Sequence, residues 1–358
     1  MNKMRKITMS LLLGLLLLAG CAGGGNSGLR EEPYSKESFS LGTYIRIRVY
    51  DEDQEGALQP AFDRIDELED KLTINDEAGA SEIDQINQQA GIEPVVVSED
   101  VYSLLKEAAN YSEESDGGFN YVIGSITQLW RIGYDDARKP EQSEIDEALK
   151  HVDYTKVQFS DEDQTVFLPE ADMMIDLGAI AKGYITDEVV ATLKEQGVTS
   201  AIIDLGGNIY VMGDNPNRDN QLWSVGIQDP NQARGVTIGT IETTNQTIVT
   251  SGIYERNLTV GDETFHHIFD STTGYPYDND IAGVSIITDQ SIDGDALSTL
   301  VYSKGIKAGL EYIEKTSDDG TEAVFVSKNG KVYVSEGLED EFKLNEGSGY
   351  TLGNREDL

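Results

Sequence analysis

The sequence predicts an α+β fold, in which helices and a largely antiparallel sheet form a single catalytic domain. Helical and strand patterns alternate irregularly along the chain, and no fixed repeat period is present. No linker long enough to mark a domain boundary follows Tyr34. The chain is also long enough to bury a hydrophobic core without disulfides, because Cys21 is its only cysteine.

Apolar spacing places the individual elements. Residues 41–50 alternate as a strand does, and residues 57–72 carry apolar side chains at helical spacing. Further helices are expected at 101–111, after Gly178 within 175–193, and at 291–310. Further strands are expected at 201–210 (interrupted by Gly206-Gly207), 223–227, 237–243 and 284–288, with a terminal hairpin over 323–334 that turns at Asn329-Gly330.

The N-terminus has the three parts of an export signal. Lys3, Arg5 and Lys6 precede a short apolar run over residues 7–18, and Leu18-Ala-Gly-Cys21 ends it. The run is too short for a permanent membrane span. The ending matches the lipobox of bacterial lipoproteins, so residues 1–20 are expected to be removed and Cys21 to carry the lipid. The alternative is an ordinary secretory signal with a chance cysteine.

The sequence therefore divides into three parts. After the signal peptide, residues 21–33 are expected to form a lipidated cysteine and flexible tether, and residues 34–358 the catalytic domain. Gly23, Gly25 and Gly28 match a dinucleotide-binding pattern by chance, since no strand precedes them and no helix follows. The expected location is the extracytoplasmic face of the cell membrane, with the lipid as the only membrane contact.

Charge and composition exclude several classes of partner. The formal net charge is −38, which repels nucleic acid and anionic lipid headgroups. Only three histidines are present, so a zinc or copper site has few ligands. A metal, if bound, is expected to take oxygen ligands, which favours Mg²⁺ or Ca²⁺.

Two motifs combine carboxylates with a turn or helix. In Asp176-Leu-Gly-Ala-Ile-Ala-Lys-Gly-Tyr184, Gly178 permits a tight turn before a helix, and Asp176 and Lys182 could meet polar parts of a ligand. In Asp295-Ala-Leu-Ser-Thr299, a carboxylate and two hydroxyls share one helix face, as Mg²⁺ prefers. For both motifs the alternative is a simple helix cap.

Two further motifs contain glycines or histidines. Ile203-Asp-Leu-Gly-Gly-Asn208 indicates a bulge or a close backbone approach at a strand end, or else a simple turn. The segment from Thr250-Ser-Gly252 to His266-His-Ile-Phe-Asp-Ser-Thr-Thr-Gly-Tyr-Pro276 holds two of the three histidines. A histidine is the usual general base near neutral pH, although a loop histidine can be purely structural.

Together, these ordered motifs resemble those of the ApbE family, the FAD:protein FMN transferases. The resemblance runs from about Leu41 to about Leu310. It includes Leu41-Gly-Thr, Ser81-Glu-Ile-Asp-Gln-Ile-Asn87 and Gly117-Gly-Phe-Asn-Tyr121, followed by the four motifs above. The family commonly has methionine at Leu41 and aspartate at Asn120.

The resemblance implies a role for each matching residue. FAD contacts are implied for Leu41, Gly118, Phe119, Asn120, Asp176, Lys182 and Phe269. Mg²⁺ is implied on Asp295, Ser298 and Thr299 and on the backbone carbonyl of Ala179. The candidate general base is His267, which directly precedes Ile268, and whether His266 acts instead is left open.

The implied reaction moves FMN from FAD to a Ser or Thr hydroxyl of another exported protein, which forms a phosphodiester and releases AMP. That partner is expected to belong to a redox chain. Hydrolysis of FAD to FMN and AMP is an alternative within the enzyme class. A flavin-binding electron carrier and a ligand-capturing uptake lipoprotein are alternatives from other classes. A carrier has no need of the magnesium motif, and an uptake protein usually has two similar halves.

Overall fold

The computed structural model describes residues 28–74, 81–316 and 320–358. The predicted signal peptide, Cys21 and most of the predicted tether lie outside these residues. Strand β1 (Leu29–Ser40) begins inside the segment 21–33, because its residues pair with β2. None of the helices described is both long and apolar enough to span a bilayer.

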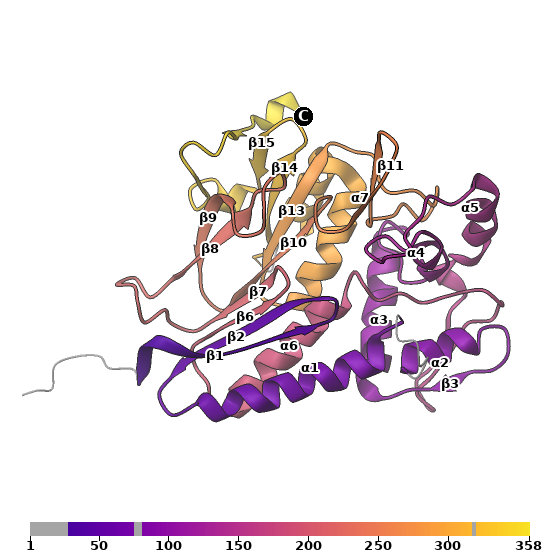
Figure 1. Cartoon of the computed structure of the whole chain (residues 1–358), viewed down its shortest axis with the longest axis horizontal. Coiled ribbons are helices and arrows are strands. Elements are labelled where there is room, and N and C mark those ends of the chain that lie inside the picture. Colours follow the sequence, from indigo (N-terminus) through magenta and orange to yellow (C-terminus); the bar gives the residue numbers. More distant parts are fainter. Residues whose placement is uncertain (1–27, 75–80, 317–319) are drawn as a thin grey trace, which may run out of the picture.

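A large sheet forms the centre of the molecule (Figure 1). Its strand order is β1-β2-β6-β7-β10-β13-β14-β15-β17, and every neighbouring pair is antiparallel except β15 and β17. The predicted α+β class with a largely antiparallel sheet is confirmed. After β1, the strands are β2 (Thr43–Asp51), β6 (Ala201–Leu205), β7 (Asn208–Met212), β10 (Gln246–Gly252), β13 (Ile281–Thr288), β14 (Glu322–Ser327), β15 (Lys331–Val334) and β17 (Thr351–Leu352).

Helices cover one face of this sheet, as Figure 1 shows for α1 (Leu58–Leu72), α6 (Ala181–Glu195) and α7 (Ser291–Thr316). The predicted periodicity of α1 is confirmed, since Phe62, Ile65 and Leu68 lie in the main core. Helix α7 continues past the expected end at residue 310, and its backbone is non-helical at Gly305. The remaining helices are α2 (Glu82–Gln88), α3 (Glu99–Glu114), α4 (Gly124–Trp130) and α5 (Gln142–Ala148).

A smaller sheet, β16-β9-β8, packs on the opposite face and encloses a second core around Trp223. Its strands are β8 (Trp223–Gln228), β9 (Thr237–Thr243) and β16 (Lys343–Leu344). Two minor sheets complete the fold. They contain β3 (Val95–Val96), β5 (Thr165–Phe167) and β4 (Gln158–Ser160), and the hairpin of β11 (Asn257–Val260) and β12 (Glu263–His266).

The strand expected over residues 201–210 is interrupted at Gly206-Gly207 as predicted, and its two parts belong to the two strands of a hairpin. Gly206 and Gly207 have φ values of 69° and 100°, and β6 and β7 pair on either side of them. Two consecutive residues with positive φ make the tight turn that joins antiparallel strands. Of the interpretations left open for the glycine pair, the turn is present, and the backbone also approaches Thr43 closely, since a Cβ at Gly206 would lie 2.2 Å from Thr43 Oγ1.

The turn between β1 and β2 also has two consecutive residues with positive φ, but the first of them is a leucine and not a glycine. Leu41 has φ 55° and Gly42 has φ 67°, so the strand expected from residue 41 begins at Thr43. A left-handed conformation is costly for leucine. The Leu41 backbone N–H donates to Glu69 Oε1 at 2.7 Å, which helps to hold this turn against α1.

Candidate active site

The N-terminal turn of α6 crosses the first turns of α7 at very short range. A Cβ atom at Gly183 would lie 2.3 Å from the Ser291 carbonyl oxygen and 2.8 Å from the Asp295 Cβ. Only glycine allows this approach. It lets the Gly183 backbone N–H donate to Asp295 Oδ2 at 2.9 Å. Asp187 of α6 strengthens the crossing by accepting the Ser291 and Ile292 N–H groups, each at 2.8 Å.

The predicted metal motif lies at this crossing. Asp295 is only 3% exposed, and its Oδ1 lies 3.4 Å from Lys182 Nζ. Ser298 Oγ donates to the Asp295 carbonyl at 2.8 Å and is 2.7 Å from Ser251 Oγ on β10. Thr299 is half-buried. The motif therefore presents a buried carboxylate and two hydroxyls from one face of α7.

The turn before α6 is held by side-chain hydrogen bonds. Thr127 Oγ1 donates to Asp176 Oδ2 at 2.6 Å, and the Gly178 N–H donates to Asp176 Oδ1 at 2.8 Å. Ile175, which precedes Asp176, makes two hydrogen bonds with the Asn87 side chain: the Asn87 amide nitrogen donates to the Ile175 carbonyl, and the amide oxygen accepts the Ile175 N–H. Among the described residues, the Ala179 carbonyl accepts no hydrogen bond. This carbonyl remains available beside Lys182.

Two arginines that the sequence motifs did not indicate join Lys182. A Cβ at Gly42 would lie 3.1 Å from Arg256 Nη2, and one at Gly133 would lie 2.8 Å from Arg256 Cδ. A Cβ at Gly207 would lie 3.5 Å from Arg234 Nη2. Glycines in two separate turns thus allow the close approach of the Arg256 side chain, and the Gly207 turn lies beside Arg234. Neither arginine forms an ion pair with a carboxylate in the described part of the chain.

Glu255 lies between these cations. A Cβ at Gly207 would be 3.5 Å from Glu255 Oε1. Surrounding protein atoms reduce the hydration of the Glu255 carboxyl group and so raise its pKa, although part of the side chain reaches solvent. The negative charge of Asp295 also raises this pKa. Lys182, Arg234 and Arg256 oppose that rise. The mutual influence of these groups shows that they share one electrostatic environment.

The two adjacent histidines have different surroundings. His266 is 8% exposed, and both ring nitrogens are occupied: Nε2 donates to the Tyr277 carbonyl at 2.9 Å, and Nδ1 accepts the Ile268 N–H at 3.2 Å. His267 Nδ1 lies 3.3 Å from the Arg256 carbonyl oxygen, so Nδ1 is the protonated nitrogen and Nε2 can accept a proton. Packing around the ring and the Arg256 charge lower the pKa of His267 to about 3.

Three side chains that were predicted to contact FAD are buried or bonded elsewhere and do not line the α6–α7 crossing. Phe119 is 1% exposed in the main core, and Phe269 is 6% exposed and packs on Trp130. Asn120 is engaged in local hydrogen bonds, donating to the Val152 carbonyl and accepting the Val122 N–H. The segment still borders the turn, because the Asp176 N–H donates to the Tyr121 carbonyl at 2.8 Å.

Of the other predicted contacts, Leu41 lies near a cation through its neighbour, and Gly118 is fixed by Tyr277 and Ser303. Leu41 is half-buried beside Gly42, which faces Arg256. Gly118 is fixed from the opposite side, since its carbonyl accepts the Tyr277 hydroxyl at 3.2 Å and a Cβ there would lie 2.4 Å from Ser303 Oγ. The backbone groups of both residues are hydrogen-bonded within the protein: the Gly118 N–H donates to the Ser115 carbonyl, and the Phe119 N–H and carbonyl both bond the Ser115 hydroxyl. The FAD contacts implied for Gly118 and Phe119 therefore stay predictions.

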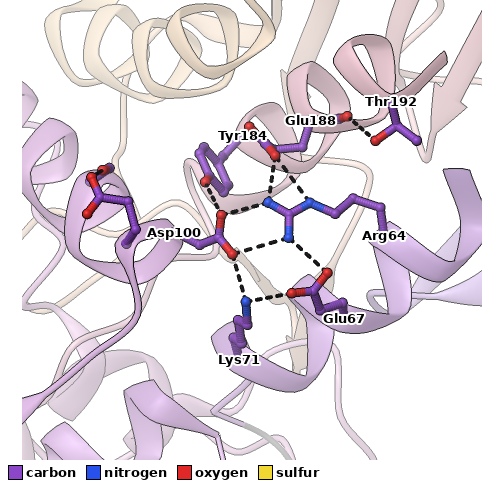
Figure 2. Close-up of polar contacts among 9 residues, drawn as sticks. Arg64, Glu67, Lys71, Asp100, Tyr184, Glu188 and Thr192 are labelled. Atoms are coloured by element: carbon purple, nitrogen blue, oxygen red, sulfur yellow. Dashed lines mark hydrogen bonds and ion pairs between the residues drawn. The ribbon is translucent and has the colours of Figure 1, made fainter. Parts of the chain in front are cut away.

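Helix α6 is anchored away from these residues by a network of ion pairs, which Figure 2 shows. Arg64 of α1 lies 2.6 Å from both Asp100 Oδ1 of α3 and Glu188 Oε2 of α6. Lys71 contacts Asp100 and Glu67 at 2.7 and 2.8 Å. The Tyr184 hydroxyl, next to Gly183 in the chain, donates to Asp100 Oδ1 at 3.1 Å.

Comparison with known proteins places the chain in a family. The model of the ApbE family matches residues 41–325. The chain belongs to the ApbE family. This confirms the family and fold that the sequence motifs predicted.

Relatives in this family cover nearly the whole chain. A FAD:protein FMN transferase of Klebsiella pneumoniae is 35% identical over 302 residues, which are 84% of this chain and 92% of the relative. One of Treponema pallidum is 33% identical over 348 residues, 93% and 95% of the two chains. The crystal structure of the ApbE protein of Thermotoga maritima has a TM-score of 0.78 at 30% identity and covers 87% of this chain and 99% of its own.

Several residues at the site of this ApbE protein were missed by reasoning from sequence. Arg234, Glu255 and Arg256 carry no spacing pattern, and Ser251 lies in a predicted motif but was given no role. Tyr134 follows Gly133, which packs against Arg256, and no feature was predicted for that segment. The sequence does offer one signal for Glu255 and Arg256: they follow the predicted motif Thr250-Ser-Gly252 within a few residues.

Proposed function

We propose that this chain is an FAD:protein FMN transferase that moves FMN from FAD to a Ser or Thr hydroxyl of an exported protein. The observation that carries the proposal is the meeting of three charged or polar elements at the α6–α7 crossing: the Asp176 turn, the Asp295 helix face and the Lys182–Arg234–Arg256 cations. The names of the relatives support the same activity.

The donor set at the crossing fits Mg²⁺. Asp295 is buried, and within residues 28–74, 81–316 and 320–358 its carboxylate meets one backbone N–H and one long lysine contact. Ser298 accepts from Ser251, which leaves a second lone pair, and the Ala179 carbonyl is open. All are hard oxygen donors, as this ion requires, and the described residues contain no cluster of three or more His, Cys, Asp or Glu for another metal. When bound, Mg²⁺ supplies positive charge that stabilises the pyrophosphate and the departing AMP.

The cations bind the anionic part of the substrate. Lys182, Arg234 and Arg256 bring three positive charges together in a chain of net charge −38. Arginine without a carboxylate partner is suited to bidentate contact with phosphate oxygens. Asp176 and its hydrogen-bonded turn fix the start of α6 so that Lys182 faces the same region.

His267 takes the proton of the acceptor hydroxyl. The hydroxyl oxygen attacks the FMN phosphorus, the bond from that phosphorus to the bridging oxygen breaks, and AMP leaves. The proton passes to His267 Nε2, because Nδ1 is held by the Arg256 carbonyl. The ring is neutral in the free protein, and the negative pyrophosphate would raise its pKa on binding. His266, with both nitrogens occupied, has a structural role.

A direct experiment tests the activity. The purified protein is incubated with FAD, Mg²⁺ and individual exported proteins of the same organism, and the products are analysed by intact mass and by nucleotide chromatography. The expected result is an acceptor heavier by one FMN less water, with equimolar AMP. Release of FMN and AMP without a modified protein would replace the proposal by FAD hydrolysis, and FAD bound without turnover would favour an electron carrier.

The proposal also places the enzyme at the extracytoplasmic face of the membrane, held by lipid on Cys21. Its support is the sequence of the leader, with basic residues, an apolar run and Leu18-Ala-Gly-Cys21. We expect Cys21→Ala to leave the protein unprocessed or free of the membrane, because two or more acyl chains are needed for stable anchoring. Membrane fractionation measures this, and a processed mutant that still sediments with membranes would contradict it.

A further inference from the structure

One face of the large sheet is left partly uncovered. The small sheet β16-β9-β8 covers strands on the side opposite α1, α6 and α7, but β1, β2 and part of β6 extend past it. Ile45, Ile47 and Val49 of β2 are fully buried on the helix side. Because strand side chains alternate, Tyr44, Arg46 and Arg48 lie on the uncovered side.

A cavity of about 190 Å³ opens on this side. It is bounded by arginines, by apolar side chains of β6 and β7, and by β8. Its lining includes Arg46, Arg48, Ile202, Asp204, Ile209 and Trp223. Such a mixture of apolar surface with a few cationic groups suits a ligand that is partly apolar and carries a negative charge.

The two arginines of the cavity differ in their partners. Arg46 Nε lies 2.8 Å from Glu37 Oε1, so its charge is already matched. Arg48 hydrogen-bonds Tyr50, and no carboxylate of the described residues lies within ion-pair distance of it. The chain has 65 acidic and only 27 basic residues, so a carboxylate partner would be easy to supply. Arg48 therefore presents an open guanidinium to an incoming carboxylate.

The cavity side continues to the candidate active site through two hairpin turns. Asp204 of the cavity accepts the Gly207 N–H at 3.2 Å, and Gly207 faces Arg234 and Glu255. The β1–β2 turn packs on the β6–β7 turn, since a Cβ at Gly206 would lie 2.2 Å from Thr43 Oγ1. Beside these turns Phe39 is 75% exposed and pairs across the strands with Tyr44, which is 37% exposed. Two adjacent exposed aromatic rings are typical of protein-binding surfaces.

We infer that this surface, defined by Phe39, Tyr44, Arg48, Ile202 and Trp223 and here named the acceptor face, docks the protein that receives FMN. The inference rests on the proposed function. The occupant is an extended segment whose carboxylate binds Arg48 and whose apolar side chains contact the aromatic pair.

The test compares acceptor kinetics of two surface variants. The probe is the exported protein that the wild-type chain modifies in the experiment above, used at saturating FAD and Mg²⁺. Arg48→Glu is expected to raise the KM for the acceptor at least about tenfold, and Phe39→Ser about fivefold, as for central interface contacts. The kcat and the KM for FAD stay within twofold. Added salt raises the wild-type acceptor KM but not that of Arg48→Glu, because salt screens the lost attraction.

Two control variants change a charge and an exposed apolar side chain outside the acceptor face. Lys194→Glu reverses a charge at the far end of α6, and Val96→Ser removes an apolar side chain that is 70% exposed on β3. Both should keep the wild-type acceptor KM. An unchanged acceptor KM in Arg48→Glu and Phe39→Ser overturns the inference while the transferase proposal stands.

Three other results would also decide against the acceptor face. A parallel rise in the KM for FAD would assign the face to nucleotide binding. A dimer in sedimentation that Phe39→Ser dissociates, with normal acceptor KM, would assign it to contact between two copies. If the wild-type chain modifies no exported protein, the proposed function itself fails and the inference falls with it.

Discussion

Helix α6 carries members of two charged clusters that have opposite degrees of internal pairing. On one side, Arg64 and Lys71 are surrounded by Glu67, Asp100 and Glu188, with contacts of 2.6 to 3.0 Å (Figure 2). At its N-terminus, Lys182 has a single carboxylate contact, at 3.4 Å. Arg234 and Arg256 form no ion pair with a described carboxylate. Lysine and arginine are thus closely paired with carboxylates in the first cluster and largely unpaired in the second.

The difference shows how to separate structural from functional charge in a very acidic protein. The first cluster joins three helices and satisfies each cation internally, so its effect should be on stability. The second keeps cations open beside glycines that leave space around them. Within the described residues, only Glu255 and Asp295 lie among these cations, and the proposed anionic substrate would supply the remaining negative charge. Mutations in the two clusters should therefore change different measured quantities.

The largest expected effect is at Asp295. Asp295→Asn keeps the shape of the side chain but removes the charge that holds the metal, so FMN transfer should fall at least about 10²-fold. Initial rates with increasing Mg²⁺ measure this, and chelation of the wild-type enzyme should reproduce the loss. Transfer at the wild-type rate by the mutant in chelator-treated buffer would show that the Asp295 face holds no essential metal.

The next effect is at His267. His267→Ala should slow transfer by about 10²–10⁴-fold at saturating FAD and Mg²⁺, the usual range for loss of a general base. His266→Ala should mainly lower the unfolding temperature, since it removes two buried hydrogen bonds. A dead His266 mutant beside a normal His267 mutant would reverse the assignment.

The lowered pKa of His267 adds a pH test. With a pKa of about 3 in the free protein, the ring is already neutral throughout the physiological range. The kcat/KM for FAD reports groups of the free enzyme. Its pH profile should therefore show no rise attributable to His267 between pH 5 and 8, roughly the range in which an unperturbed histidine titrates. An inflection near 6.5 that His267→Ala removes would contradict the geometry described for this ring.

In the structural cluster, Asp100→Asn should lower stability and leave catalysis nearly intact. It removes the charge between Arg64 and Lys71 and should cost about 2 kcal/mol of unfolding free energy, with transfer changed less than about threefold. Arg64 and Lys71 hold the pKa of Asp100 well below its usual range. A depressed carboxyl pKa stabilises the fold above the pKa of the unfolded state, and this stabilisation is lost as pH falls.

Denaturant unfolding at several pH values measures that linkage. The wild-type advantage over Asp100→Asn should be full near pH 7 and should shrink as pH falls below about 4. A constant difference down to acid pH would mean that the Asp100 charge does not contribute to folding.

The smallest expected effect is at Tyr184, which joins the two regions. Tyr184→Phe removes only the hydroxyl bond to Asp100 and should lower the unfolding free energy by about 1 kcal/mol. Because Gly183 is fixed independently by Asp295 and by the close crossing with α7, the transfer rate should change little. A rate loss above tenfold would mean that the network positions Lys182.

Reasoning from sequence reached the parts of this molecule that depend on local pattern. The amphipathic spacing in α1 and the tight turn after Asp176 follow from neighbouring residues, and both are present. The family resemblance brought Asp176, Lys182 and Asp295 forward. The structure places Lys182 Nζ 3.4 Å from Asp295 Oδ1, and Asp176 holds the turn before the helix that carries Lys182. The sequence left a bulge and a turn open at Gly206-Gly207, because two glycines permit a reversal as readily as a bulge, and the structure has the turn.

What could not be predicted depends on contacts between distant segments. Arg64 meets Glu188 across 124 positions, and Arg256 meets Gly42 and Gly133 from other turns. No spacing within one element encodes such contacts. The same limit explains Phe119 and Phe269, whose positions matched an FAD pattern while their rings fill the core.

The central claim is tested most directly by the initial rate of FMN transfer, measured side by side for Asp295→Asn and Asp100→Asn with saturating FAD, Mg²⁺ and acceptor. The two changes are chemically identical and affect one carboxylate in each cluster. The account predicts that Asp295→Asn loses at least about 10²-fold while Asp100→Asn stays within about threefold of wild type. Equal losses in both, or a larger loss in Asp100→Asn, would contradict it.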